Sequence, residues 1–142
     1  MPSDVIQRAT VYSSRNRRDL RMPARPDIDP VELADVLSNL VVVEAIDGGR
    51  DYMHRIAGAA AETLLGAPMH GARLSRLAGD RDALAAWRNG LALARSFRAP
   101  HFARFAPQQG GTSVSAVFLP LSRGAQGEEA DFVLTAVIEA KR

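Results

Sequence analysis

The sequence predicts an α+β domain built on one five-stranded antiparallel sheet. Two strand-like runs precede a block of helical sequence, and three more strand-like runs follow it. Runs of strands on either side of a helical block are typical of this fold class. The connections after the last predicted helix have hairpin length, which indicates a meander of neighbouring strands. With 142 residues, 46% of them hydrophobic, the chain has enough apolar material for the core of one ordinary domain.

The first 25 residues are predicted to form a basic, helical extension, and residues 26–142 the domain itself. Residues 3–20 read as a helix capped by Ser3, with an apolar stripe at helical spacing: Val5, Ile6, Ala9 and Tyr12. This stripe fits either a partner surface or a helix folded over its own domain. The extension lacks long charge runs and aromatic residues spaced for stacking on bases, so nucleic acid is not an expected partner.

The next segment is expected to lead into the first strand pair. Prolines break residues 21–30, and Asp29 followed by Pro30 indicates an N-cap and the first residue of a short helix. The β-branched run at 40–46, a turn signal at 47–49 and a second run at 51–58 predict a hairpin.

Two helices are predicted after this hairpin. One covers residues 59–66 and ends at Gly66, and a longer one covers 80–97 with Asp80 as its cap. Gly90 lies inside the longer helix, where glycine costs about 1 kcal/mol relative to alanine. The sequence offers no local reason for it.

Three strands complete the prediction, at 101–107, 112–122 and 131–141, with hairpin loops at 108–111 and 123–130. Both faces of the last strand are mostly apolar. We therefore expect it to lie in the centre of the sheet, with helices on one side and a partner chain or the N-terminal helix on the other.

This order of elements resembles that of PAS domains. The segments MPARPDIDPVEL (22–33), DYMHRIAG (51–58), LLG (64–66) and FLPLS (118–122) are similar to those of a small subgroup of stand-alone bacterial PAS domains. The resemblance implies a PAS-like five-stranded antiparallel sheet with a helical cross-connection and an N-terminal helical extension. It also implies a sensor or interaction module in signal transduction. A cytoplasmic protein is expected because the sequence shows no apolar signal region and no apolar stretch long enough to span a bilayer.

Three features depart from that family pattern. His54 stands where the family often has an aromatic residue, and Tyr12 and Ser13 lie where it usually has a tryptophan. No output domain follows the last predicted strand before Arg142. We therefore expect the signal to pass to a separate signalling protein. The apolar stripe of the N-terminal helix and the two apolar faces of the last strand predict a homodimer.

The cofactors of PAS domains can be tested against the composition. The chain has no cysteine, so a flavin–cysteine adduct and a coumaryl thioester are excluded. The helix at 80–97 contains no histidine, which argues against heme, and Asn89 is its only asparagine, which argues against non-covalent flavin. The three scattered histidines lack metal-ligand spacing. A small organic ligand, or no ligand, remains.

A pocket between the sheet and the helices is the predicted site. Strand alternation places Tyr52, His54 and Ile56 on one face, toward the helices. The candidate lining residues are Tyr52, His54, Ile56, Ala60, Thr63, Leu64, Trp87, Leu91 and Ser115. The alternative is a filled core in which the polar groups among them hydrogen-bond one another.

No catalytic motif is present, and we expect the protein not to be an enzyme. The sequence lacks a GxSxG elbow, a P-loop and paired carboxylates in a plausible cleft. An enzyme on a related cone-shaped α+β fold is a further alternative, but the hairpin at 40–58 precedes the helices. Two functions remain: a metabolite-binding sensor that acts through protein partners, and a ligand-free homodimerising module.

Overall fold

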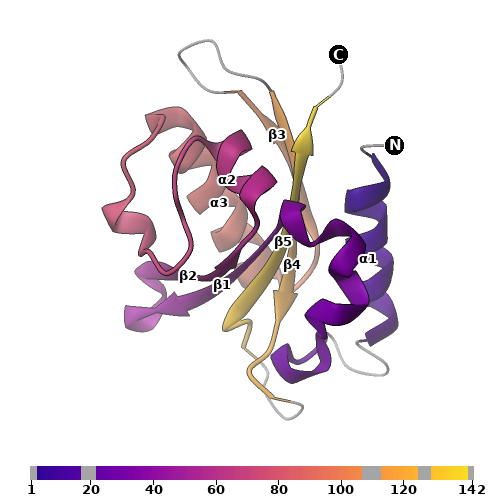
Figure 1. The fold of residues 1–142 in the computed structure, drawn as a ribbon. Coiled ribbons are helices and arrows are strands. Elements are labelled where there is room, and N and C mark those ends of the chain that lie inside the picture. Colours follow the sequence, from indigo (N-terminus) through magenta and orange to yellow (C-terminus); the bar gives the residue numbers. More distant parts are fainter. Residues whose placement is uncertain (1–2, 17–21, 107–112, 125–128, 141–142) are drawn as a thin grey trace.

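The structure is a computed structural model that describes residues 3–16, 22–106, 113–124 and 129–140 (Figure 1). The predicted order of elements is confirmed. In chain order these are α1 (Ser3–Asn16), η1 (Arg25–Asp27), η2 (Pro30–Asn39), β1 (Leu40–Ile46), η3 (Asp47–Gly49), β2 (Asp51–Ala57), α2 (Ala59–Leu65), η4 (Leu74–Arg76), α3 (Arg81–Phe97), β3 (His101–Phe105), β4 (Val114–Leu121) and β5 (Phe132–Glu139). The predicted loop at 108–111 and the predicted helical residues after Asn16 lie outside the described ranges.

The five strands form one antiparallel sheet in the order β2-β1-β5-β4-β3. The hairpin β1–β2 joins the meander β3–β4–β5 through the pair β1–β5. β5 is therefore the central strand, as its two apolar faces predict, and every residue from Phe132 to Ile138 is buried.

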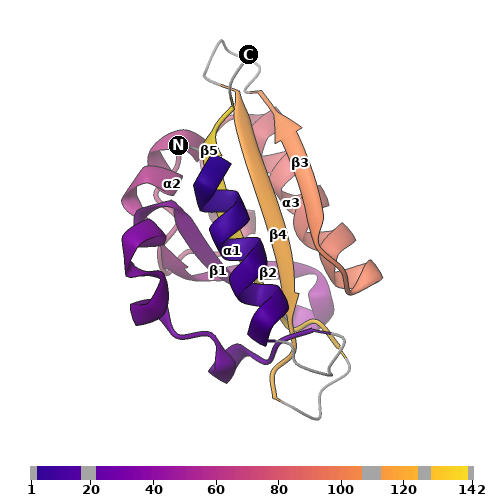
Figure 2. The same ribbon diagram turned by 90° about the vertical axis from the view of Figure 1, so that its right-hand side faces the viewer.

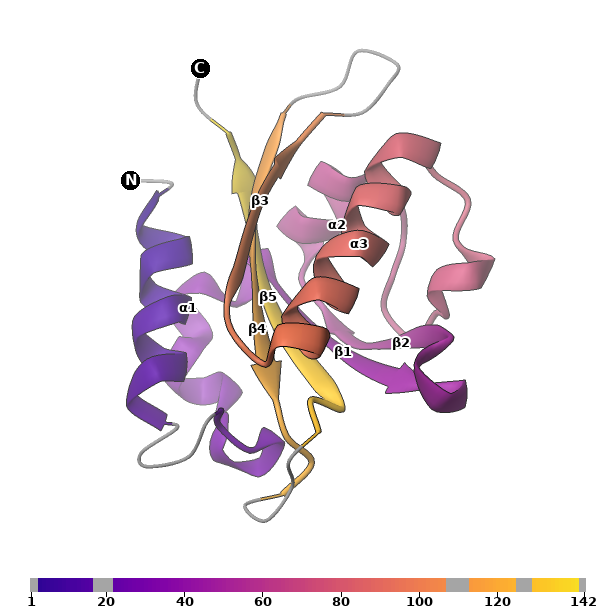
Figure 3. The same cartoon turned by 180° about the vertical axis from the view of Figure 1, so that it is seen from behind.

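Helices cover both faces of this sheet (Figures 1 and 3). We call the face against α2 and α3 the inner face, and the face against α1 and η2 the outer face. Each face carries its own apolar cluster. The inner cluster includes Trp87, Leu91, Phe118 and Val133, and the outer cluster includes Tyr12, Leu33, Leu119 and Leu134.

The apolar stripe of α1 packs against the outer face of its own domain. Ala9 and Tyr12 are buried there. The Tyr12 hydroxyl donates to Glu32 Oε1 at 3.1 Å and accepts from the Asp29 amide at 2.9 Å. Arg8 also forms an exposed ion pair with Asp35 at 3.0 Å, which adds little stability by itself. Of the two arrangements that the sequence allows for α1, the structure has the helix folded over the sheet (Figure 2).

One polar side chain lies in the buried interior of β5. The Thr135 hydroxyl donates to the Val41 carbonyl of β1 at 2.9 Å. Immediately before β1, the side-chain Nδ2 of Asn39 donates to the Val137 carbonyl at 2.9 Å. These two bonds join β1 to β5 at fixed positions along both strands.

A β-bulge in the first hairpin changes the predicted faces of β2. Val43 pairs with His54 but the adjacent Val42 pairs with Ile56, so Arg55 has no opposite residue. Past such a bulge the side chains exchange faces. Tyr52 lies in the inner cluster, whereas Ile56 packs against the outer cluster. The prediction that Ile56 shares a face with Tyr52 and His54 is therefore wrong.

The structure also explains Gly90. Its position in α3 faces β4, and a Cβ atom there would overlap the ring of Phe118. Phe118 is completely buried and cannot move away without opening space elsewhere in the inner cluster. Glycine at this position is thus required by the close approach of α3 to the sheet.

We predict that Gly90→Ala lowers the free energy of unfolding by about 2 kcal/mol, because overpacking outweighs the better helix propensity of alanine. Thermal or urea unfolding followed by circular dichroism measures the effect. The double variant Gly90→Ala/Phe118→Leu should lose less free energy of unfolding than the two single variants lose together, since leucine frees the space that Cβ needs. A Gly90→Ala variant more stable than the wild type would contradict this account.

Candidate functional site

Strand β2 and helix α3 bring four of the predicted site residues together on the inner face. Tyr52 and His54 come from β2, and Trp87 and Leu91 come from one side of α3; all four are buried. Trp87 Nε1 donates a hydrogen bond to His54 Nε2 at 3.2 Å. The two ring planes are inclined by 25°, with centroids 6.3 Å apart, so the rings meet edge to edge. An imidazole–indole pair therefore lies at the centre of the predicted site.

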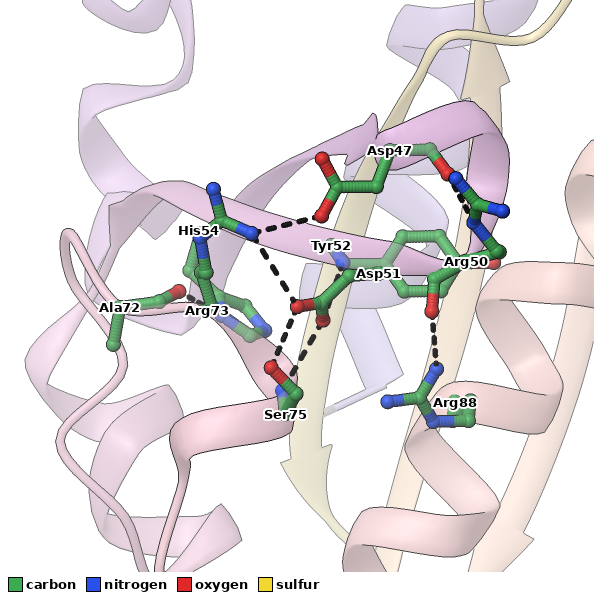
Figure 4. Close-up of polar contacts among 9 residues, drawn as sticks. All are labelled: Asp47, Arg50, Asp51, Tyr52, His54, Ala72, Arg73, Ser75 and Arg88. Carbon is green, nitrogen blue, oxygen red and sulfur yellow. Dashed lines mark hydrogen bonds and ion pairs between the residues drawn. The ribbon is translucent and has the colours of Figure 1, made fainter.

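The same histidine fastens the connector that follows α2. His54 Nδ1 lies 2.9 Å from the Ala72 carbonyl (Figure 4). The backbone adds His54 N–H to the Ala72 carbonyl at 3.0 Å and Gly71 N–H to the His54 carbonyl at 2.8 Å. Because the indole N–H can only donate, His54 Nε2 accepts and Nδ1 carries the proton. Neutral His54 thus satisfies both ring nitrogens and joins β2, α3 and the connector.

Burial lowers the pKa of His54, and the hydrogen bond with Ala72, which favours the charged form, only partly opposes it. Protonation would put a proton on Nε2, facing the indole N–H of Trp87. It would therefore break the hydrogen bond by which Trp87 of α3 is joined to His54 of β2. The imidazole can accept a proton only at the expense of this contact.

A second polar group, Asp51, lies three residues before His54 in the same strand. Asp51 accepts hydrogen bonds from the Ser75 hydroxyl at 2.6 Å, the Ser75 amide at 3.1 Å and the Tyr52 amide at 2.8 Å (Figure 4). Burial raises its pKa, but these hydrogen bonds outweigh burial and hold the pKa of Asp51 below its ordinary value. The ionised carboxylate anchors η4 to the start of β2.

Two arginines of α3 enclose the ring of Tyr52 at the edge of the site. The guanidinium carbons of Arg88 and Arg95 lie 5.9 and 5.8 Å from the ring centroid, within cation–π range. Arg88 donates to the Arg50 carbonyl at 3.3 Å, and Arg95 to the Ala130 carbonyl at 2.8 Å. These contacts close the site toward the turn between β1 and β2.

Side chains occupy the space around the imidazole–indole pair. The ring of Phe118 lies 5.2 Å from that of Trp87, and Met69 and Leu65 are buried in the same cluster. Among the described residues, every buried side-chain nitrogen or oxygen has a hydrogen-bond partner. The polar groups of Trp87 and His54 thus hydrogen-bond each other, as expected of polar groups within a packed core.

Two predicted lining residues of the sheet lie on the outer face. Ile56 is moved there by the bulge. Ser115 alternates with the inner-face residues Val114 and Ala116, and it shares the outer face with Val117. Placing Ser115 in the site is wrong, because the period of two along β4 assigns it to the same side as Val117.

Helix α2 presents a different side to the core from the one predicted. Its buried residues are Ala61 and Leu65, and Leu64 packs partly against the inner cluster. Thr63 is exposed, and its hydroxyl donates to the Ala59 carbonyl of the same helix, so Thr63 does not line the site. Ala60 is half-buried, and its amide donates to the Ser38 hydroxyl at the start of the helix.

Sequence reasoning missed four groups that complete the site: Asp51, Ala72, Ser75 and Phe118. Asp51 reads as the first residue of the strand at 51–58, and no feature of the sequence indicates its partners. Ala72 and Ser75 belong to the connector at 67–79, where the sequence has no periodicity. Only Phe118 could have been predicted from the sequence, because alternation along β4 places it on the opposite face of the sheet from Val117.

A groove of about 470 Å³ lies elsewhere, between the end of α1 and the turn from α3 to β3. Thr10, Ser13, Met22, Phe97, Pro100 and Pro120 are among its lining residues. None of the predicted site residues borders it. It is a surface feature, separate from the imidazole–indole pair.

A central antiparallel sheet in this strand order, with a helical cross-connection on one face, defines a domain of the PAS fold. A family model described as "PAS domain" matches residues 1–129. The chain belongs to this family, and it is a sensory or signalling module in that general sense. PAS domains are generally sensory modules and not enzymes.

Among solved structures, the fold is similar to the crystal structure of a sensory box sensor histidine kinase from Vibrio cholerae. The two share 13% sequence identity with a TM-score of 0.50, over 79% of this chain and 89% of that one. No curated protein matches the chain. Within the described ranges, none of the helices has the length and apolar character needed to cross a membrane.

We predict that the free energy of unfolding falls as the pH is lowered below about 6.5, the pKa of histidine in the unfolded chain. The folded-state pKa of His54 lies below its unfolded value, which is about 6.5. As the pH falls, the unfolded chain therefore takes up the proton first. The stability that is present above the unfolded pKa is lost progressively until the pH reaches the lower, folded-state pKa of His54. The slope reaches at most about 1.4 kcal/mol per pH unit for one proton.

Urea unfolding followed by the fluorescence of Trp87, the only tryptophan, measures this slope. His54→Gln should flatten it, whereas His70→Gln, at an exposed position, should leave it unchanged. An unchanged slope in His54→Gln would assign the pH dependence to other groups.

We also predict that Trp87→Phe costs about 2–3 kcal/mol, because packing is reduced and Nε2 of buried His54 loses its donor. A double-mutant cycle with His54→Leu, measured by circular dichroism, should give a coupling energy of about 1 kcal/mol. Strict additivity of the two single variants would show that the hydrogen bond adds nothing to stability.

Proposed function

We propose that the protein is a signalling module that holds no ligand in its resting state and acts by contact with a separate protein. The single observation that carries this proposal is the closed Trp87–His54 pair. Trp87 Nε1 and His54 Nε2 are hydrogen-bonded to each other, and Phe118 packs against the indole ring. An apolar site with unpaired, convergent polar groups would instead favour a resident small molecule.

The contacts of His54 support a route from the core to the surface. This residue forms three hydrogen bonds with residues 71 and 72, which lie in a segment with several exposed residues, among them His70 and Arg73. A change at His54 would therefore alter a surface segment that another protein can contact. A signal of this kind biases one arrangement of a segment over another.

The expected partners are a second copy of the chain and a signalling protein in trans. PAS family membership supports the signalling role. The exposed aromatic side chains of Phe97 and Phe102 support protein contacts.

A metabolite sensor is the second candidate, favoured by the polar character of the buried pair. A small molecule with one donor and one acceptor could replace the hydrogen bond between Trp87 and His54. It could do so only if Trp87 moved, because the indole ring now occupies the space next to Phe118. If the protein is a metabolite sensor, the ligand binds only when the side chain of Trp87 moves away from His54.

Native mass spectrometry of the protein purified without added ligand distinguishes the two candidates. We expect the native mass to equal a whole number of 15.3 kDa chains with no additional small molecule. The denatured spectrum of the same sample is the control. A small molecule present only in the native spectrum would contradict the ligand-free proposal and support the metabolite sensor.

A further inference from the structure

The two edges of the sheet differ in how they are covered. Along β2, Met53 forms an antiparallel bridge with Arg73, and residues 71 and 72 exchange backbone hydrogen bonds with His54. At the other edge, β3 pairs with β4 alone among the described strands, and no isolated bridge reaches it within the described ranges. Edge strands left in this state are templates for pairing with another chain.

The edge formed by β3 also carries exposed aromatic side chains. Phe102 is 59% exposed on the outer side of β3, and Phe97, at the end of α3, is 72% exposed. Figure 2 shows that α1 lies over the middle of the sheet and leaves β3 beside it. The opposite side of β3 faces the core, where Ala103 and Phe105 pack against the inner cluster. The strand that lacks a second neighbour therefore carries one exposed aromatic side chain, Phe102, and a second, Phe97, lies shortly before it in the chain.

The sequence of β3, His-Phe-Ala-Arg-Phe, is complementary to itself when two copies run antiparallel about Ala103. On the outer side, Phe102 would lie opposite Arg104 of the partner subunit. On the inner side, His101 would lie opposite Phe105 of the partner subunit. Cross-strand pairs of an aromatic ring with a cation or a second ring are favourable, and this register places no like charges opposite each other.

The geometry points to a second copy of this chain as the occupant of this edge. We propose that β3 pairs antiparallel with β3 of another copy about Ala103, so that one sheet continues through both subunits. Because β2 is covered by its own connector, the described strands of each chain leave one edge uncovered. The pairing therefore closes as a two-fold dimer instead of growing into a filament. This inference rests on the proposed function, for which it specifies the surface.

Thiol cross-linking tests the register directly, because the chain contains no cysteine. Two Ala103→Cys chains would place their thiols opposite each other at the two-fold axis, within the Cα separation that a disulfide requires. We expect Ala103→Cys to form a cross-linked dimer under mild oxidation at least about tenfold faster than Ala85→Cys. Ala85 is an exposed alanine of α3 outside the proposed interface, and it undergoes the same substitution.

Sedimentation analysis of the full chain measures the association itself. We expect the wild-type mass to rise from 15.3 kDa to twice that value with increasing concentration. Phe102→Glu should weaken dimerisation at least about tenfold, since it replaces an interface ring by a carboxylate. The matched control is Val31→Glu, a similar change at a side chain that is 79% exposed on η2, and it should dimerise like the wild type. The fluorescence of Trp87 verifies that both variants are folded.

Two results would overturn the proposal. One is a wild-type chain that stays monomeric up to about 0.5 mM, well above the micromolar range of weak specific complexes. The other is a dimer that tolerates Phe102→Glu and does not cross-link through Ala103→Cys faster than through Ala85→Cys, which would assign dimerisation to a different surface. Either result leaves the ligand-free core standing, since native mass spectrometry tests that separately.

Discussion

The hydrogen bond between Trp87 and His54 is the contact on which the rest of the inner face depends. It joins the edge strand β2 to the long helix α3, which lie far apart in the sequence. The other ring nitrogen of His54 holds the connector that leads from α2 to α3. A single neutral imidazole on β2 thus holds both the connector and α3 against the sheet. Replacing either ring would leave a buried nitrogen without a partner, which is costlier than the loss of one exposed contact.

Much of the fold could be predicted from the sequence because its signals are local. The proline after Asp29, the turn at 47–49 and the alternating apolar residues of the strands each act over a few positions. The central place of β5 followed from burial on both of its faces. The site was only partly predictable, because it depends on relations between distant segments. Tyr52, His54, Trp87 and Leu91 meet as expected, whereas the partners of Asp51 lie in a connector without a periodic pattern.

The errors have specific physical causes. Strict alternation fails for Ile56 because one unpaired residue in β2 exchanges the two faces, and Arg55 has no feature that marks a bulge in advance. Thr63 was misplaced because the rotation of a short helix is set by what it packs against, and two turns give little periodicity to read. Gly90 was unexplained because its cause, the ring of Phe118, lies on a strand that follows it by almost thirty residues.

The hydroxyl of Thr135 has a consequence for how the chain reaches this fold. In a strand that is apolar on both faces, the hydrophobic pattern alone does not penalise pairing that is displaced by one residue. Such a displacement would carry Thr135 to the outer face, into the cluster that contains Leu40 and Leu134, and away from the Val41 carbonyl. The hydroxyl would then be buried without an acceptor, at a cost of about 1–3 kcal/mol. One threonine thus discriminates against misaligned sheets during folding. It does so at the strand where a displacement by one residue would exchange the side chains of the inner and outer clusters.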